Sequence, residues 1–173
     1  MRKLKYIKTM AAFAAAALIC TGCSDKTVPT ASGTEQSTNS DSEKTAKSIE
    51  EIYQEIGQAV SLKSPQCMDD DFIENYYGID AAALEEYVFS MSEDAAQAET
   101  VIIMKVKSTD DLEDLTSCLQ TVVDEKKNEM ENYIPEQFAI VEKSKVQTKD
   151  NYIWLVISDS ADAISDIIES GLF

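Results

Sequence analysis

Two segments, residues 100–107 (TVIIMKVK) and 152–157 (YIWLVI), carry β-branched and apolar side chains at nearly every position. Successive side chains of a strand point to opposite faces of a sheet, so these segments are apolar on both faces. Strands of this composition are typical of the inside of a sheet. We therefore predict that both segments are strands, with 152–157 at a central position.

Each segment has a partner strand close by in the sequence. Residues 87–91 (YVFSM) alternate in the same manner and form a predicted hairpin with 100–107 around the loop 93–98. Residues 145–149 form a second predicted hairpin with 152–157 through a short turn. The two hairpins together predict an antiparallel sheet of about four strands.

Helical patterns flank both hairpins. Ser48 and Glu51 have the spacing of a capping box, and apolar residues follow at helical intervals. Further predicted helices begin at Asp69, at Ser108 or Thr109, at Pro135, and at Asp159 or Ser160, with a single turn at Asp80. The helix beginning at Ser108 or Thr109 is the longest, and its apolar stripe comprises Leu112, Leu115, Leu119, Val122, Met130 and Tyr133. The order α-ββα-ββα predicts an α+β fold with the helices packed on one face of the sheet.

This arrangement is accompanied by a family resemblance over about residues 48–170. The segments that carry it are YYGID at 76–80, ETVIIMKVK at 99–107 and YIPEQFAIVEKSKVQTKDNYIWLVIS at 133–158. The chain resembles the domain of unknown function 4358 family of Gram-positive bacterial lipoproteins. That resemblance implies a compact extracytoplasmic domain, without an assigned activity and without catalytic residues to carry over.

The N-terminus has the features of an export signal. Basic residues precede residues 10–19, which contain no polar side chain, and this run is too short for a transmembrane helix. The following sequence, Cys20 to Cys23, resembles the lipobox of bacterial lipoproteins, in which Cys23 receives a diacylglycerol and becomes the mature N-terminus. The motif departs from the usual pattern at Cys20, where Leu is common. Cleavage before Cys20 is disfavoured, because it would place the bulky Ile19 where signal peptidases prefer a small residue. A plain secreted protein is the alternative to a lipoprotein.

The chain therefore divides into three predicted parts. Residues 1–22 are the signal peptide, residues 23–47 are the lipidated cysteine with a disordered tether, and residues 48–173 are a single domain. The tether contains ten Ser or Thr between positions 24 and 47, and it lacks the apolar surface needed to offset its ordering entropy. We expect the protein at the outer face of the cell membrane, with the palmitate-type lipid on Cys23 as its membrane contact.

Charge and missing residue types narrow the chemistry. Residues 1–22 contain four of the 15 basic residues and none of the 32 acidic ones, so the mature chain has a net charge of −21. Nucleic acid is therefore excluded as a partner. The chain has no His, and its only Arg is Arg2 in the signal peptide, so it lacks imidazole-based catalysis and an arginine fork for phosphate. No catalytic residue, metal ligand or cofactor is expected.

Two surface features remain as candidates. The run Asp69 to Asp71 could hold calcium through oxygen ligands, but its spacing does not match an EF-hand loop. Three Asp at the start of a helix are more typical of a solvated cap that interacts with the helix dipole. Tyr76 and Tyr77 are adjacent in a predicted helix and cannot both face its buried side, so one of them is expected in an interaction surface.

Cys67 and Cys118 form an even pair in an oxidising compartment. A disulfide between them is one interpretation, and a half-buried free thiol at Cys118 is the other. The sequence as a whole favours a non-catalytic accessory or binding domain that contacts an envelope protein or wall component. The family resemblance implies a role in supporting cell-envelope modification. The alternative is an envelope enzyme that uses carboxylates or calcium.

Lipidation is directly testable. Metabolic labelling with an alkyne fatty acid is expected to mark the wild-type protein, whereas Cys23→Ala removes the acceptor sulfur and remains unlabelled. Cys20→Ala serves as the matched control and keeps the label. Label that persists on the Cys23→Ala variant would contradict the assignment.

Overall fold

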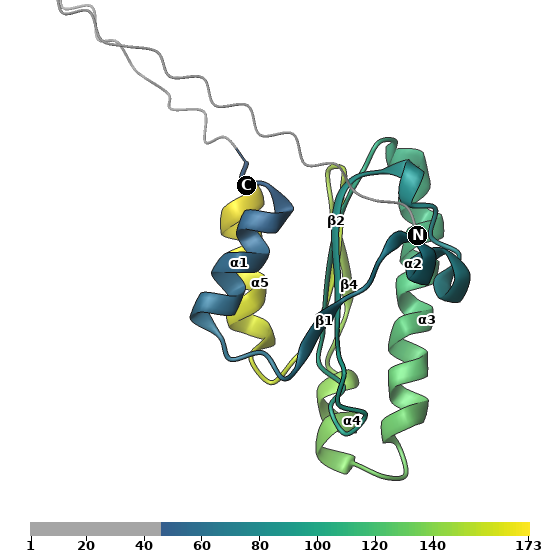
Figure 1. Ribbon diagram of the computed structural model, residues 1–173, viewed down its shortest axis with the longest axis vertical. Coiled ribbons are helices and arrows are strands. Elements are labelled where there is room, and N and C mark those ends of the chain that lie inside the picture. Colours follow the sequence, from purple (N-terminus) through teal and green to yellow (C-terminus); the bar gives the residue numbers. More distant parts are fainter. Residues whose placement is uncertain (1–45) are drawn as a thin grey trace, which may run out of the picture. The chain divides into compact units, whose positions relative to one another are not determined.

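The computed structural model describes residues 46–173, so the predicted signal peptide, Cys23 and nearly all of the tether lie outside the described residues. Figure 1 shows the arrangement of the elements. The α-helices are α1 (Ile49–Ala59), α2 (Asp70–Tyr77), α3 (Leu112–Met130), α4 (Pro135–Val141) and α5 (Ala161–Leu172), and two short 3₁₀ helices are η1 (Ala81–Ala83) and η2 (Thr109–Asp111). The strands are β1 (Pro65–Cys67), β2 (Leu84–Ser92), β3 (Thr100–Val106), β4 (Val146–Lys149) and β5 (Tyr152–Ile157). No helix in this part of the chain has the length and apolar character needed to cross a membrane.

The strands form one five-stranded sheet in the order β1-β2-β3-β5-β4, with antiparallel neighbours throughout. β3 pairs with β5 from Thr100 opposite Ile157 to Lys105 opposite Tyr152. The α+β class, the antiparallel sheet and both hairpins are thus confirmed, and β5 is an internal strand as its composition predicts. The fifth strand is β1, a three-residue edge strand that pairs with β2.

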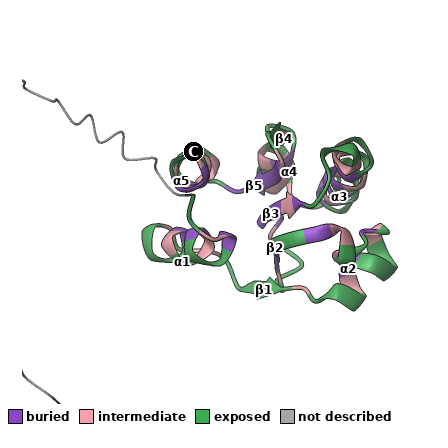
Figure 2. Cartoon of the chain, turned by 90° about the horizontal axis from the view of Figure 1, so that it is seen from above, coloured by how far each residue is buried: buried purple, intermediate pink, exposed green. Residues whose placement is uncertain are grey.

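Helices cover both faces of the sheet, whereas the sequence led us to expect them on one. Figure 2 shows α1 and α5 on one side of the strands and α2 and α3 on the other. The alternating side chains of β3 enter two separate cores: Val101 and Ile103 pack toward α1 and α5, and Ile102 and Met104 pack toward α2, α3 and α4. Strands that are apolar on both faces need cover on both faces, which is the physical reason for the difference.

The capping box of α1 forms as predicted. The backbone N–H of Glu51 donates to Ser48 Oγ over 3.2 Å, and the backbone N–H of Ser48 donates to Glu51 Oε2 over 3.0 Å. These bonds to Ser48 lower the pKa of the Glu51 carboxyl. They also fix the point at which the chain enters the domain, where the Lys47 N–H donates to the carbonyl of Gly171 at the end of α5 over 2.9 Å.

α1 and α5 touch at Gly171. A Cβ atom at this position would lie 2.6 Å from Ile52 Cγ1 and 2.8 Å from Ile52 Cδ1. Ile52 is completely buried, so a shift of its side chain would displace neighbouring core atoms. Glycine is therefore required at position 171 by the close approach of the two helices, not by its backbone conformation.

This contact predicts opposite effects for two glycine substitutions. Gly171→Ala is expected to lower the free energy of unfolding by about 1 to 3 kcal/mol, because the added methyl group overpacks the core. Gly57→Ala is the matched control: it also lies in a helix, no atom lies within 4 Å of its Cβ position, and alanine there should raise stability by roughly 0.5 to 1 kcal/mol. Urea unfolding followed by circular dichroism measures both, and a stable Gly171→Ala variant would contradict the packing described.

Candidate functional site

The exposed aromatic surface of the domain is built on α2. Asp69 caps this helix by accepting the Phe72 N–H at Oδ1 over 2.9 Å, and Gly78 ends it in a left-handed conformation with φ of 68°. Phe72 and Tyr76 are four residues apart and therefore lie on one side of the helix. Their rings stack with centroids 4.6 Å apart and planes inclined by 26°.

The two adjacent tyrosines point in different directions. Tyr77 is half-buried and stacks on Phe89 of β2 with ring centroids 5.4 Å apart, so it anchors α2 to the sheet. Tyr76 is 70% exposed. Helical spacing predicts this division, and the role of the pair in an interaction surface stays a prediction.

Carboxylates border this aromatic cluster. The Tyr87 hydroxyl donates to Asp70 Oδ1. Burial raises the pKa of Tyr87 to about 12, and the hydrogen bond to Asp70 and its negative charge act in the same direction. Burial also raises the pKa of Tyr77, with a further contribution from Glu125 of α3. The negative charges thus stand beside the rings rather than in a separate patch.

The run Asp69 to Asp71 is divided among different partners. Asp69 Oδ1 holds the first turn of α2, Asp70 accepts the hydroxyl of Tyr87, and Asp71 is exposed. Within residues 46–173 there is no group of three or more acidic, Cys or His side chains placed to share a metal ion. The geometry agrees with the interpretation of this run as a helix cap.

A groove of about 690 Å³ lies between the first turns of α5 and the segment that leads into β4. Lys143 and Lys145 line one side of it, and Asp159 and Asp162 line the other. No ion pair joins the two sides in the described part of the chain. The sequence contains no local signal for this groove, because its sides are brought together only by the pairing of β4 with β5 and the packing of α5.

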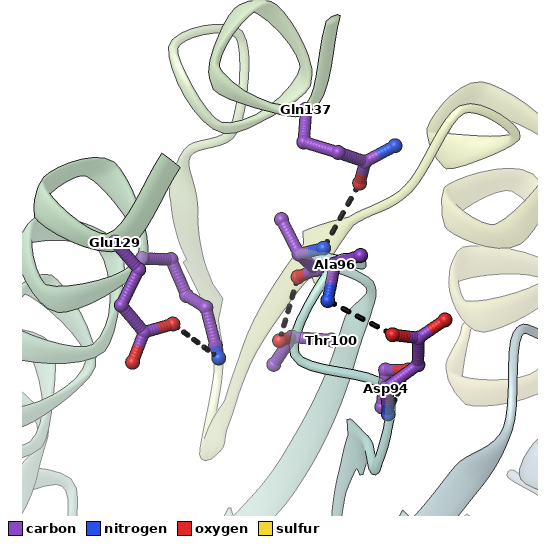
Figure 3. A network of polar contacts seen from close by, with 8 residues as sticks. Asp94, Ala96, Thr100, Glu129 and Gln137 are labelled. Atoms are coloured by element: carbon purple, nitrogen blue, oxygen red, sulfur yellow. Dashed lines mark hydrogen bonds and ion pairs between the residues drawn. The ribbon is translucent and has the colours of Figure 1, made fainter. Parts of the chain in front are cut away.

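The β2–β3 loop is tied to α4 by the polar contacts in Figure 3. Ala98 N donates to Gln137 Oε1 of α4 over 2.9 Å, and Thr100 Oγ1 donates to the Ala98 carbonyl over 3.0 Å. Within the loop, Ala96 N donates to Asp94 Oδ1 over 2.9 Å. These bonds fix the start of β3 relative to α4.

Glu99 is the buried polar centre of this region and was not singled out from the sequence. Its residue is 8% exposed, and its carboxylate accepts the Lys63 N–H at one oxygen and the Ser158 hydroxyl at the other, the latter over 2.7 Å. It therefore joins the loop after α1 to the loop after β5. Ser158 lines the groove, so Glu99 positions part of the groove wall.

The predicted alternative of a disulfide between Cys67 and Cys118 is not realised, and both thiols are free. Cys67 pairs with Ser90 across β1 and β2, and Ser90 Oγ forms a 2.7 Å hydrogen bond with the hydroxyl of Tyr53 on α1. Cys118 packs into the core on the α3 side, where burial raises the pKa of its thiol. The sheet separates the two cysteines, so their even number after the predicted cleavage is not evidence of a bond.

Tyr133 also differs from the sequence expectation. It was placed on the apolar stripe of the longest helix, but α3 ends at Met130 and Tyr133 lies in the following turn, where it is 83% exposed. It makes no ring contact within residues 46–173. Tyr76 and Tyr133 are therefore both exposed, and Tyr76 differs in having a stacking partner, Phe72.

A comparison with protein families matches residues 58–158 to the family described as Domain of unknown function (DUF4358). The matched region runs from near the end of α1 to the residue after β5, so it includes the α2 surface and Glu99. Neither the comparison with curated proteins nor that with solved structures found a match. The predicted resemblance to this domain family is thus confirmed over residues 58–158.

The contacts of Glu99 predict a loss of stability when its carboxylate is removed. Glu99→Ala leaves the Lys63 N–H and the Ser158 hydroxyl without their acceptor and is expected to lower the free energy of unfolding by about 1 to 3 kcal/mol. Glu99→Gln keeps one acceptor oxygen and should recover part of this loss. The control is Glu93→Ala, an exposed position in the same loop, which should change stability by less than about 0.5 kcal/mol. Equal urea midpoints for Glu99→Ala and Glu93→Ala would contradict the role assigned to Glu99.

Proposed function

This chain belongs to the DUF4358 family, and we propose that it is a non-catalytic binding domain, anchored at the outer face of a bacterial membrane through Cys23, that contacts an envelope protein. The observation that carries the proposal is the exposed stack of Tyr76 on Phe72, presented by a short capped helix. In the cell, we propose that this contact supports modification of the envelope in an accessory role.

An exposed aromatic stack is well suited to recognition. Tyrosine offers a large contact area and loses little conformational entropy when it binds, which is why interfaces are enriched in it. Phe72 limits the motion of the Tyr76 ring before any partner arrives. Phe72 in turn contacts Phe89 of β2, with the two ring centroids 6.5 Å apart. The surface is therefore formed in advance, which reduces the free-energy cost of association.

The side chains of the mature chain support binding over catalysis. Without His and Arg, the chain lacks the groups that most often activate a nucleophile or hold a phosphate. The carboxylates on α2 are used as a cap and as the acceptor of a tyrosine hydroxyl. Carboxylates that hold the first turn of α2 and a tyrosine hydroxyl stabilise this surface, which suits presentation of the surface better than chemistry on it.

The position of the chain entry supports an anchored arrangement. The chain enters the domain at Lys47, which bonds to Gly171 of α5, whereas α2 packs on the opposite face of the sheet. Figure 2 shows α1 and α5 separated from α2 by the strands. A tether attached at α1 would therefore leave the Tyr76 surface open to a partner.

Photocrosslinking in cells tests this function. With a photoreactive phenylalanine analogue at position 76 of the full-length chain, we expect a defined crosslinked envelope protein. The same analogue at position 133, a still more exposed tyrosine on another part of the domain, should not yield it. Crosslinks that are absent from both positions, or identical at both, would refute the Tyr76 surface as the binding site.

A further inference from the structure

We infer that the protein segment bound by the α2 surface is basic, with a lysine or arginine side chain lying against the outer ring face of Tyr76. This inference rests on the proposed function, because it specifies the chemistry of the partner at the same surface. It follows from three features of the described residues: a ring with one free face, a local excess of carboxylates and the absence of basic side chains from the surrounding sequence.

The ring geometry leaves one face of Tyr76 for a ligand. Phe72 covers the other face at a centroid distance of 4.6 Å, and the residue as a whole is 70% exposed. The face of an aromatic ring carries negative electrostatic potential and attracts cations within about 6 Å of the ring centre. The alkyl part of a lysine or arginine side chain also packs on apolar surface while its charged end stays in water.

The charge around the ring selects a cation. No basic residue occurs between Lys63 and Lys105, while the same stretch contains ten acidic residues. On α3, which faces α2, Lys126 is already paired with Glu129 over 2.8 Å. A positively charged partner is therefore attracted during approach, and an acidic partner or an anionic lipid surface is repelled.

The structure also favours a protein cation over a metal ion. The carboxylates of Asp69 and Asp70 accept protein donors, and the described residues hold no cluster of three or more potential metal ligands. A guanidinium or ammonium group needs no such cluster, because the ring face attracts it directly and the general acidity of the surrounding surface adds to the attraction. The aromatic face and the dispersed charges fit an extended basic side chain.

Binding of two matched peptides to the mature lipidated protein in neutral phosphatidylcholine nanodiscs tests the inference. The probes are an acetylated arginine hexapeptide and its citrulline counterpart, which has nearly the same shape without the charge. We expect the arginine peptide to bind, more tightly at low salt, and the citrulline peptide to lose this binding. Tyr76→Leu, which keeps apolar area but removes the ring, should weaken the arginine peptide about threefold to fivefold.

Two control variants separate the ring from the general acidity of the protein. Tyr76→Phe keeps the ring face and should bind like the wild type, and Tyr133→Leu alters an exposed tyrosine elsewhere and should also have no effect. Both positions are exposed, so we expect each variant to fold, and circular dichroism checks that it does. Equal affinity for arginine and citrulline peptides, or an unchanged affinity in Tyr76→Leu, would overturn the inference.

The outcome is separable from that of the crosslinking experiment. If position 76 crosslinks an envelope protein but peptide binding does not depend on Tyr76, the surface is a binding site and only its basic specificity is wrong. If position 76 yields no specific crosslink, the proposed function itself is wrong.

Discussion

The pairing of β3 with β5 is the contact on which the other layers of the domain depend. Both strands carry apolar side chains on both faces, so their pairing creates two apolar surfaces that must be removed from water. α1 and α5 cover one surface, and they meet so closely that glycine is needed at position 171. α2, α3 and α4 cover the other, and α2 is held there by Tyr77 on Phe89, which turns Tyr76 outward.

Local signals made most of the fold predictable. The capping box at Ser48 and the apolar periodicity of the helices act over a few residues, and the structure contains the elements that they indicate. β1 was missed because it has three exposed residues and exists only through its pairing with β2. The composition of β3 and β5, which are apolar on both faces, predicts helices on both faces of the sheet. The order of strands and helices along the chain does not contain this information and also fits a two-layer arrangement with helices on one face.

The candidate site also has features that follow from local sequence and features that depend on residues far away in the chain. The different directions of Tyr76 and Tyr77 follow from helix geometry, since neighbouring residues cannot face the same side. The role of Glu99 depends on partners 36 and 59 residues away, and nothing near it in the sequence marks them. The cysteines show the converse: their number and compartment made a disulfide reasonable, but the sheet lies between Cys67 and Cys118, a feature that neither number nor compartment reveals.

The effect of the large negative charge depends on where the fold places it. Dispersed over the surface, this charge repels anionic lipid and polymer surfaces. At α2 part of this charge lies among aromatic side chains, since Asp70, on the same helix that presents the stack of Phe72 and Tyr76, accepts the hydroxyl of Tyr87. In the complex that we propose, this charge attracts basic side chains and repels acidic surfaces. Because the chain enters the domain on the α1 side, the sheet lies between the entry point and α2. The two apolar surfaces of β3 and β5 therefore separate the side on which the chain enters the domain at Lys47 from the side that presents Tyr76.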